Sequence, residues 1–189
     1  MTEMSGLPAV VLVDTGVLIR GLGHQPNDPL SPVCTTLLQF LFQNRRVLIS
    51  ALSLVEIQRG TPKTGAAPVP IPHTPKVAVV AFDTDCANVC GRLMPHEKLL
   101  EIKSQTGLFV SYLKYDSLIV ASAIRWGASM IVSADTGMQR RHGELIPICH
   151  PQVFDTRQGV MFHRSARTVK DSPETQEQAS QHPDDDIPF

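Results

Sequence analysis

The sequence predicts an α/β domain in which helices cover both faces of a parallel β-sheet. Five short apolar runs, rich in β-branched residues, alternate along the chain with segments whose apolar residues recur at helical spacing. Strands that alternate with helices are joined by right-handed crossovers, which make the strands parallel. With 189 residues, of which 42% are hydrophobic, the chain is long enough for one domain with a sizeable core.

Each predicted strand is a short apolar run. In chain order, the predicted strands are residues 8–13, 47–50, 77–82, 130–133 and 145–149. The helices are predicted from apolar spacing and capping signals at residues 33–43, 53–60, 84–94, 96–103 and 116–126. Ser53 and Glu56 fit a capping box that would start the second of these helices, and Gly60 would end it. Residues 61–76 hold five prolines, a density that excludes a regular helix and favours an extended or mobile loop.

Composition argues against a membrane or secreted protein. No stretch approaches the roughly 18 apolar residues of a membrane span, and the N-terminus lacks the basic start and apolar run of a signal peptide. The four cysteines form no CxxC pair and lack the density of a disulfide scaffold, which predicts a reducing cytoplasm. Cys86 and Cys90 are one helical turn apart, as on one side of a helix.

Charge divides the chain into two parts. Lys170–Phe189 holds six acids and one base, so residues 1–169 keep 16 bases and 12 acids, a balance of about +4. A mildly basic body is compatible with nucleic-acid binding. The chain from about Arg164 is rich in Ser, Gln, Asp, Glu and Pro. We therefore expect a domain over residues 1–163 and a disordered acidic tail over residues 164–189.

Four acids lie at the ends of the apolar runs or one turn beyond them: Asp14, Glu56, Asp116 and Asp135. The carboxyl ends of parallel strands share one edge of the sheet, where ligands bind, so these acids should converge in one crevice. Carboxylates packed together repel one another and require a counter-ion. Hard oxygen ligands suit Mg²⁺ or Mn²⁺, and a carboxylate-held metal that keeps its waters can cleave phosphodiesters.

Each acid also has an ordinary explanation. Glu56 could complete the capping box, and Asp116 could stabilise a helix N-terminus. Asp135 could cap a turn, and Asp14 could belong to a strand-to-helix turn. Their shared topological position favours the metal site over these four separate explanations.

Four segments around these acids resemble the successive motifs of PIN-domain nucleases, above all those of bacterial VapC-type toxins, over about residues 9–150. They are Val11-Leu12-Val13-Asp14-Thr15, Ser50-Ala51-Leu52-Ser53-Leu54-Val55-Glu56, Tyr115-Asp116-Ser117-Leu118-Ile119-Val120-Ala121-Ser122-Ala123 and Ile131-Val132-Ser133-Ala134-Asp135. The resemblance implies a three-layer α/β/α fold with a five-stranded parallel sheet. It also implies Mg²⁺ or Mn²⁺ on the four acids, with the hydroxyls of Thr15 and Ser133 beside them. Cleavage of RNA or structured DNA would then leave 5′-phosphate and 3′-hydroxyl ends.

The chain departs from the family at two points. Thr136-Gly137-Met138-Gln139 supplies no further acid after Asp135, and the proline-rich loop replaces a helical stretch that often contacts an antitoxin or a second subunit. An antitoxin and a homodimer are the partners that the family implies. Basic residues expected near the rim, where they could contact a nucleic-acid backbone, are Lys98, Lys103, Lys114, Arg140 and Arg141.

Other chemistries lack support in the sequence. There is no GxGxxG, Walker or nucleophile-elbow motif, and the histidines form no HExxH or close pair. His142, His150 and His163 are interpreted as surface or loop residues.

The last six residues resemble the tip of bacterial single-stranded DNA-binding proteins, and the stretch before them resembles the flexible linker of that family. They are Asp184, Asp185, Asp186, Ile187, Pro188 and Phe189. In that family the terminal Phe enters an apolar pocket, its carboxylate meets an Arg, and the aspartates meet a basic rim on replication and repair proteins. The alternative is an acidic, solubilising tail that ends in Phe.

The leading hypothesis is therefore a metal-dependent nuclease that cleaves single-stranded RNA in the manner of a toxin. Its tail would recruit it to the partners of single-stranded DNA-binding protein. One alternative is a structure-specific DNA nuclease of replication or repair. The other is an inactive PIN-like scaffold that competes for the same partners.

Overall fold

A five-stranded parallel sheet lies at the centre of the fold, with strand order β3-β2-β1-β4-β5. The computed structural model describes residues 6–23, 25–64, 71–72, 74–107 and 109–154. The strands are β1 (Val10–Val13), β2 (Arg46–Ser50), β3 (Val77–Val80), β4 (Met130–Val132) and β5 (Ile148–Cys149). The predicted five-stranded parallel sheet is confirmed, and β1 lies at its centre, between β2 and β4.

Helices connect the strands. They are α1 (Thr15–Gly21), α2 (Ser31–Asn44), α3 (Ala51–Thr64), α4 (Thr84–Leu93), α5 (His96–Thr106), α6 (Val110–Arg125) and α7 (Thr136–His142), followed by the short 3-10 helix η2 (Pro151–Phe154). None of the described helices is long and apolar enough to span a membrane. The chain divides into a unit of Met1–Gln158 and a second of Gly159–Phe189. The predicted boundary at residue 163 and the acidic tail lie outside the described residues.

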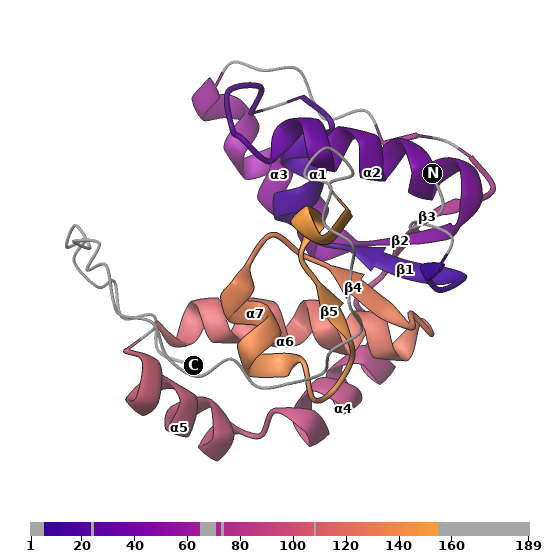
Figure 1. The fold of residues 1–189 in the computed structure, drawn as a ribbon. Coiled ribbons are helices and arrows are strands. Elements are labelled where there is room, and N and C mark those ends of the chain that lie inside the picture. The colour runs from indigo at the N-terminus through magenta and orange to yellow at the C-terminus, as the bar shows by residue number, and fades with distance from the viewer. Residues whose placement is uncertain (1–5, 24, 65–70, 73, 108, 155–189) are drawn as a thin grey trace. The chain divides into compact units, whose positions relative to one another are not determined.

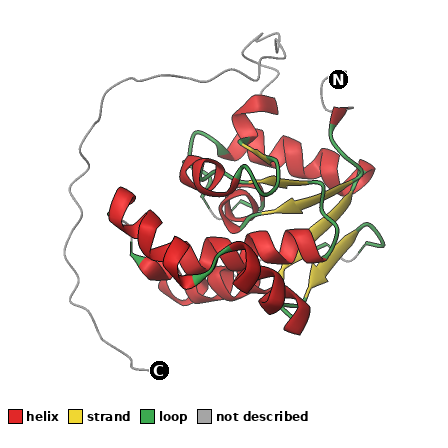
Figure 2. Ribbon diagram, turned by 90° about the horizontal axis from the view of Figure 1, so that it is seen from below, coloured by secondary structure: helices red, strands yellow, loops and turns green. Residues whose placement is uncertain are grey.

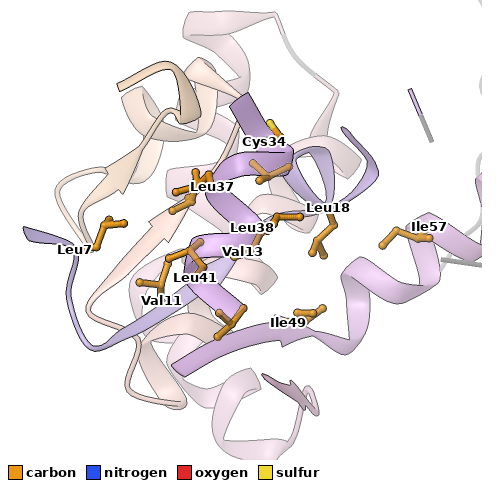
Figure 3. Packing of buried hydrophobic residues seen from close by; sticks show 13 residues of the cluster. Leu7, Val11, Val13, Leu18, Cys34, Leu37, Leu38, Leu41, Ile49 and Ile57 are labelled. Carbon is orange, nitrogen blue, oxygen red and sulfur yellow. The ribbon is translucent and has the colours of Figure 1, made fainter. Parts of the chain in front are cut away.

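Successive side chains of each central strand point to opposite faces of the sheet and pack in two separate cores. Val11 and Val13 of β1 belong to one core, whereas Leu12 between them belongs to the other. The first core packs α1 and α2 on the sheet, with Leu18 and Leu38 near its centre (Figure 3). The second packs α6 and α7 on the opposite face, so the three-layer α/β/α arrangement is confirmed (Figures 1 and 2).

A smaller apolar cluster extends the second layer. Met94, Leu99 and Leu113 are buried together, which attaches α5 to the first part of α6. The 16-residue α6 therefore touches both the sheet and the outer helices. This packing fixes the helix that carries Asp116.

Two expectations about α3 are wrong. The helix begins at Ala51, directly after β2, so Ser53 lies inside it and caps nothing. Ser53 is fully buried, and its hydroxyl has no hydrogen-bond partner. The helix also runs on to Thr64, although residues 61–64 were expected in the proline-rich loop. One proline removes only one helical hydrogen bond, so a helix can continue past it.

Asp116 was expected at the start of a helix, and this expectation is wrong too. The helix α6 begins six residues earlier, at Val110, and Asp116 lies in its second turn. The two seven-residue helices α1 and α7 were not predicted. The last strand, β5, is two residues long instead of five.

Candidate functional site

Two of the four acids follow neighbouring strands at the carboxyl edge of the sheet. Asp14 comes directly after β1, and its backbone N–H donates to the Val132 carbonyl of β4 at 3.0 Å. It is also the N-cap residue of α1, but its side chain makes no capping hydrogen bond. Asp135 is the N-cap of α7, and its Oδ1 accepts from the Gly137 N–H at 2.6 Å. The Asp14 carboxylate therefore takes no part in capping α1, whereas one oxygen of the Asp135 carboxylate caps α7.

The hydroxyls of Thr15 and Ser133 hold two of the acids in place. Thr15 Oγ1 donates to Glu56 Oε2 at 2.5 Å, which links the first residue of α1 to α3. Ser133 Oγ donates to Asp14 Oδ2 at 2.8 Å and accepts from the Asp135 N–H at 3.0 Å. Both hydroxyl residues therefore contact a carboxylate of the four acids.

Arg141 joins the other two acids. Its Nη2 donates to Asp116 Oδ2 on α6 and, at 3.0 Å, to Asp135 Oδ2. Arg141 was expected near the rim, where it could contact a nucleic-acid backbone, but its side chain is only 11% exposed and pairs with the acids instead. The two acids that pair with Arg141 differ in exposure: the Asp116 side chain is 14% exposed and that of Asp135 is 48% exposed. The acidic cluster therefore opens to solvent at Asp135.

Burial sets the charge state of the deepest acid. Asp14 is buried, and desolvation raises the pKa of its carboxyl from 3.8 to about 6, against the lowering effect of the Ser133 hydrogen bond. The negative charges of Glu56 and Asp116 raise this pKa further. Desolvation also raises the pKa of Asp116, with Arg141 opposing it and Asp135 and Glu56 adding to it.

Charge interactions thus link the four acids, which come from four separate segments of the chain: Asp14 interacts with Glu56 and Asp116, and Asp116 interacts with Glu56 and Asp135. As the side chains stand, no three His, Cys, Asp or Glu residues in the described part of the chain are arranged to hold a metal ion. The donors themselves fit one: the guanidinium of Arg141 pairs with only two of the four carboxylates, and the deepest carboxylate, that of Asp14, is buried with an elevated pKa. Oxygen donors with excess negative charge suit Mg²⁺ or Mn²⁺.

Sequence reasoning gave no role to two residues that neighbour the acids in the sequence. Arg59, three residues after Glu56 on α3, donates to the Tyr115 hydroxyl at 3.4 Å, and Tyr115 directly precedes Asp116. The helical spacing of Arg59 from Glu56 was a usable signal, because residues three apart share a helix face. Elsewhere, an open depression of about 550 Å³ is lined by Asp85, Asn88, Val89, Arg92 and Arg125 and contains none of the four acids.

The expectation for His142 is wrong. This residue is fully buried at the end of α7, and neither ring nitrogen has a hydrogen-bond partner. Desolvation, with a smaller effect of Arg141, lowers the pKa of its imidazole from 6.5 to about 4. His150 is half-buried, and His163 lies outside the described residues. The six residues of the C-terminal tip lie outside them as well.

Comparisons with known proteins show a likeness to solved structures. No family model matches the sequence, and no curated protein matches it. Among solved structures, the chain is similar to one described as VapBC2 from Rickettsia felis bound to a DNA fragment from their promoter. The similarity covers 75% of this chain and 98% of that chain, with 18% sequence identity and a TM-score of 0.49.

Proposed function

We propose that the protein is a Mg²⁺- or Mn²⁺-dependent nuclease that hydrolyses phosphodiester bonds, with single-stranded RNA as its preferred substrate. The convergence of Asp14, Glu56, Asp116 and Asp135 is the observation that carries the proposal. It occurs at the carboxyl edge of a parallel sheet, where α/β proteins bind ligands. A structural role alone would not require four mutually repelling carboxylates in one place.

Each residue has a definite task in this proposal. The four carboxylates would hold the cation, Thr15 fixes the orientation of Glu56, and Ser133 fixes that of Asp14. A bound divalent cation would supply charge neutralisation at phosphate and a water of lowered pKa. The exposed side of Asp135 leaves an approach for a phosphodiester from solvent.

The pair of Arg59 and Tyr115 supports a single-stranded substrate. It offers a cation three residues after Glu56 on α3 and an aromatic ring on the residue before Asp116 on α6. Single-stranded nucleic acids are bound by positive charge along the backbone and by aromatic side chains that stack on bases. We expect Arg59→Met to raise the KM for RNA and to weaken its dependence on salt.

The substrate class is tested with a panel of labelled oligonucleotides at equal concentration. Purified protein with Mn²⁺ should cleave single-stranded RNA faster than single-stranded DNA or a flapped duplex, leaving 5′-phosphate ends. Preferred cleavage of the flapped duplex would favour the alternative of a DNA nuclease of replication or repair. Absence of cleavage on all three substrates would leave the inactive scaffold.

The C-terminal tip supports a proposed partner class, the proteins that bind the tip of single-stranded DNA-binding protein. The linker of about 20 residues would span roughly 25 Å as a flexible chain. Deleting Ile187, Pro188 and Phe189 should abolish capture of such a protein but spare cleavage of free RNA. A synthetic peptide of the last six residues should compete for the full-length chain, and binding that ignores both deletion and peptide would contradict the proposal. The other proposed partners, an antitoxin and a second copy of the chain, rest on the sequence resemblance alone.

A further inference from the structure

We infer that Arg141 is a built-in cation of the acidic site, which competes with the divalent metal for Asp116 and Asp135 and so sets the affinity for that metal. The inference deepens the proposed function and rests on it. Within the site, the guanidinium of Arg141 contacts two of the four acids and balances part of their negative charge.

The contacts of Arg141 are those of a counter-ion. A single nitrogen, Nη2, donates to both Asp116 and Asp135. The side chain is 11% exposed, and its Nε is buried without a hydrogen-bond partner. A guanidinium usually donates two parallel hydrogen bonds to one carboxylate. In its position between Asp116 and Asp135, the guanidinium of Arg141 leaves part of its hydrogen-bonding capacity unused. The attraction of the two carboxylates therefore holds it there.

Gly137 leaves space for the guanidinium of Arg141 in this position. A Cβ at residue 137 would lie 2.3 Å from Arg141 Nη1 and 2.9 Å from Asp135 Oδ1, closer than such contacts allow. Gly137 does not have the positive φ that would demand glycine for backbone reasons. The missing side chain thus admits the guanidinium against the N-terminal turn of α7.

A divalent cation and the guanidinium of Arg141 compete for the same carboxylate oxygens. Both are positive, so each lowers the affinity of the carboxylates for the other. The side-chain arrangement agrees with this competition: Asp116 and Asp135 converge on Nη2, and among the described residues no three His, Cys, Asp or Glu side chains are arranged to hold a metal ion. Binding of the metal therefore requires Arg141 to leave its position between the two acids.

The competition is tested by titrating Mn²⁺ into the metal-free protein, without nucleic acid, by calorimetry. Arg141→Met keeps most of the apolar stem but removes the charge, and should bind Mn²⁺ about tenfold more tightly. Its melting temperature without metal should fall, and saturating Mn²⁺ should raise it by more than in the wild type. Gly137→Ala keeps the charge of Arg141 but fills the space that its guanidinium occupies. This variant should also bind Mn²⁺ more tightly than the wild type.

Arg140→Met is the matched control, because it removes the same charge from the exposed neighbouring residue. Its Mn²⁺ affinity should stay within about twofold of the wild type, since exposed charges are screened. Equal or weaker Mn²⁺ binding by Arg141→Met than by Arg140→Met would overturn the inference and leave the proposed function standing. Absence of Mn²⁺ binding by the wild type and all three variants would overturn the proposed function itself.

Discussion

At the scale of single residues, Asp14 shows a conflict between stability and charge. Its carboxylate is buried, receives a hydrogen bond from Ser133, and lies near two other acids. Its pKa of about 6, against 3.8 when exposed, means that folding without metal is opposed by ionisation of this group. Such a residue is poorly explained by stability alone.

We predict that Asp14→Asn stabilises the metal-free protein. The folded protein holds the Asp14 proton more tightly than the unfolded chain does, so this group lowers stability as pH rises from 3.8 to about 6. At about pH 7 the variant should be more stable by roughly 3 kcal/mol, an order-of-magnitude figure from the size of the pKa shift. Urea unfolding in a chelator measures this difference. It should vanish in acid below the ordinary pKa, and a variant less stable at neutral pH would contradict the assignment.

His142 should have the opposite dependence on pH. Its pKa of about 4 lies below the ordinary 6.5, so the folded protein keeps it neutral and loses stability as pH falls through this window. We predict that His142→Leu removes this loss and raises stability at neutral pH by about 1–3 kcal/mol, because two buried ring nitrogens without partners disappear. Thermal melts between about pH 4 and pH 7 test it. A parallel drop in both proteins would show that the ring is paired or solvated.

At the scale of elements, the contact between α1 and α2 depends on Gly21. A Cβ at this residue would lie 2.4 Å from Leu38 Cδ1 and 3.0 Å from the Cys34 carbonyl oxygen, so the helices could not approach as they do. We predict that Gly21→Ala destabilises the protein by about 1–3 kcal/mol.

Gly91→Ala is the control, because it lies in α4 with nothing within 4 Å of its would-be Cβ and should stabilise by about 0.5–1 kcal/mol. Chemical denaturation of both variants gives the comparison. Equal effects of the two substitutions would contradict the role of Gly21.

Elements with a clear apolar pattern could be predicted from the sequence, and those defined mainly by tertiary contacts could not. The strands from β1 to β4 and the helix α2 follow from their buried runs. The capping box failed because α3 starts directly on the strand β2, so its first turn is defined by the sheet. The helices α1 and α7 are seven residues long, too short for a periodic signal.

The same distinction applies to the candidate site. The four acids and two hydroxyls could be named from the sequence because each lies in or beside an apolar run that resembles a family motif, although Asp116 lies inside α6 and not at a strand end. Arg141 was assigned to the rim, because its approach to Asp116 joins residues 25 apart in sequence and depends on side-chain direction and on the space at Gly137. Contacts of this kind are absent from any local pattern.

At the scale of the whole molecule, the site joins the two cores. Glu56 belongs to α3, whose Ile57 packs in the core on one face of the sheet, whereas Asp116 belongs to α6, which packs on the other face. Asp14 and Asp135 lie between them, after β1 and near the end of β4. Ligand binding at this edge would therefore stabilise both cores at once.

Cleavage of a labelled single-stranded RNA by wild type and Asp116→Asn, with and without Mn²⁺, tests the central claim most directly. Asp85→Asn serves as a control, because Asp85 is an exposed acid on α4, outside the four-acid cluster. The wild type and Asp85→Asn should cleave with Mn²⁺ and stop in a chelator, whereas Asp116→Asn should lose at least about a hundredfold in rate while its melting curve stays cooperative. Undiminished Mn²⁺-dependent cleavage by Asp116→Asn would contradict the claim that the four acids form the active site.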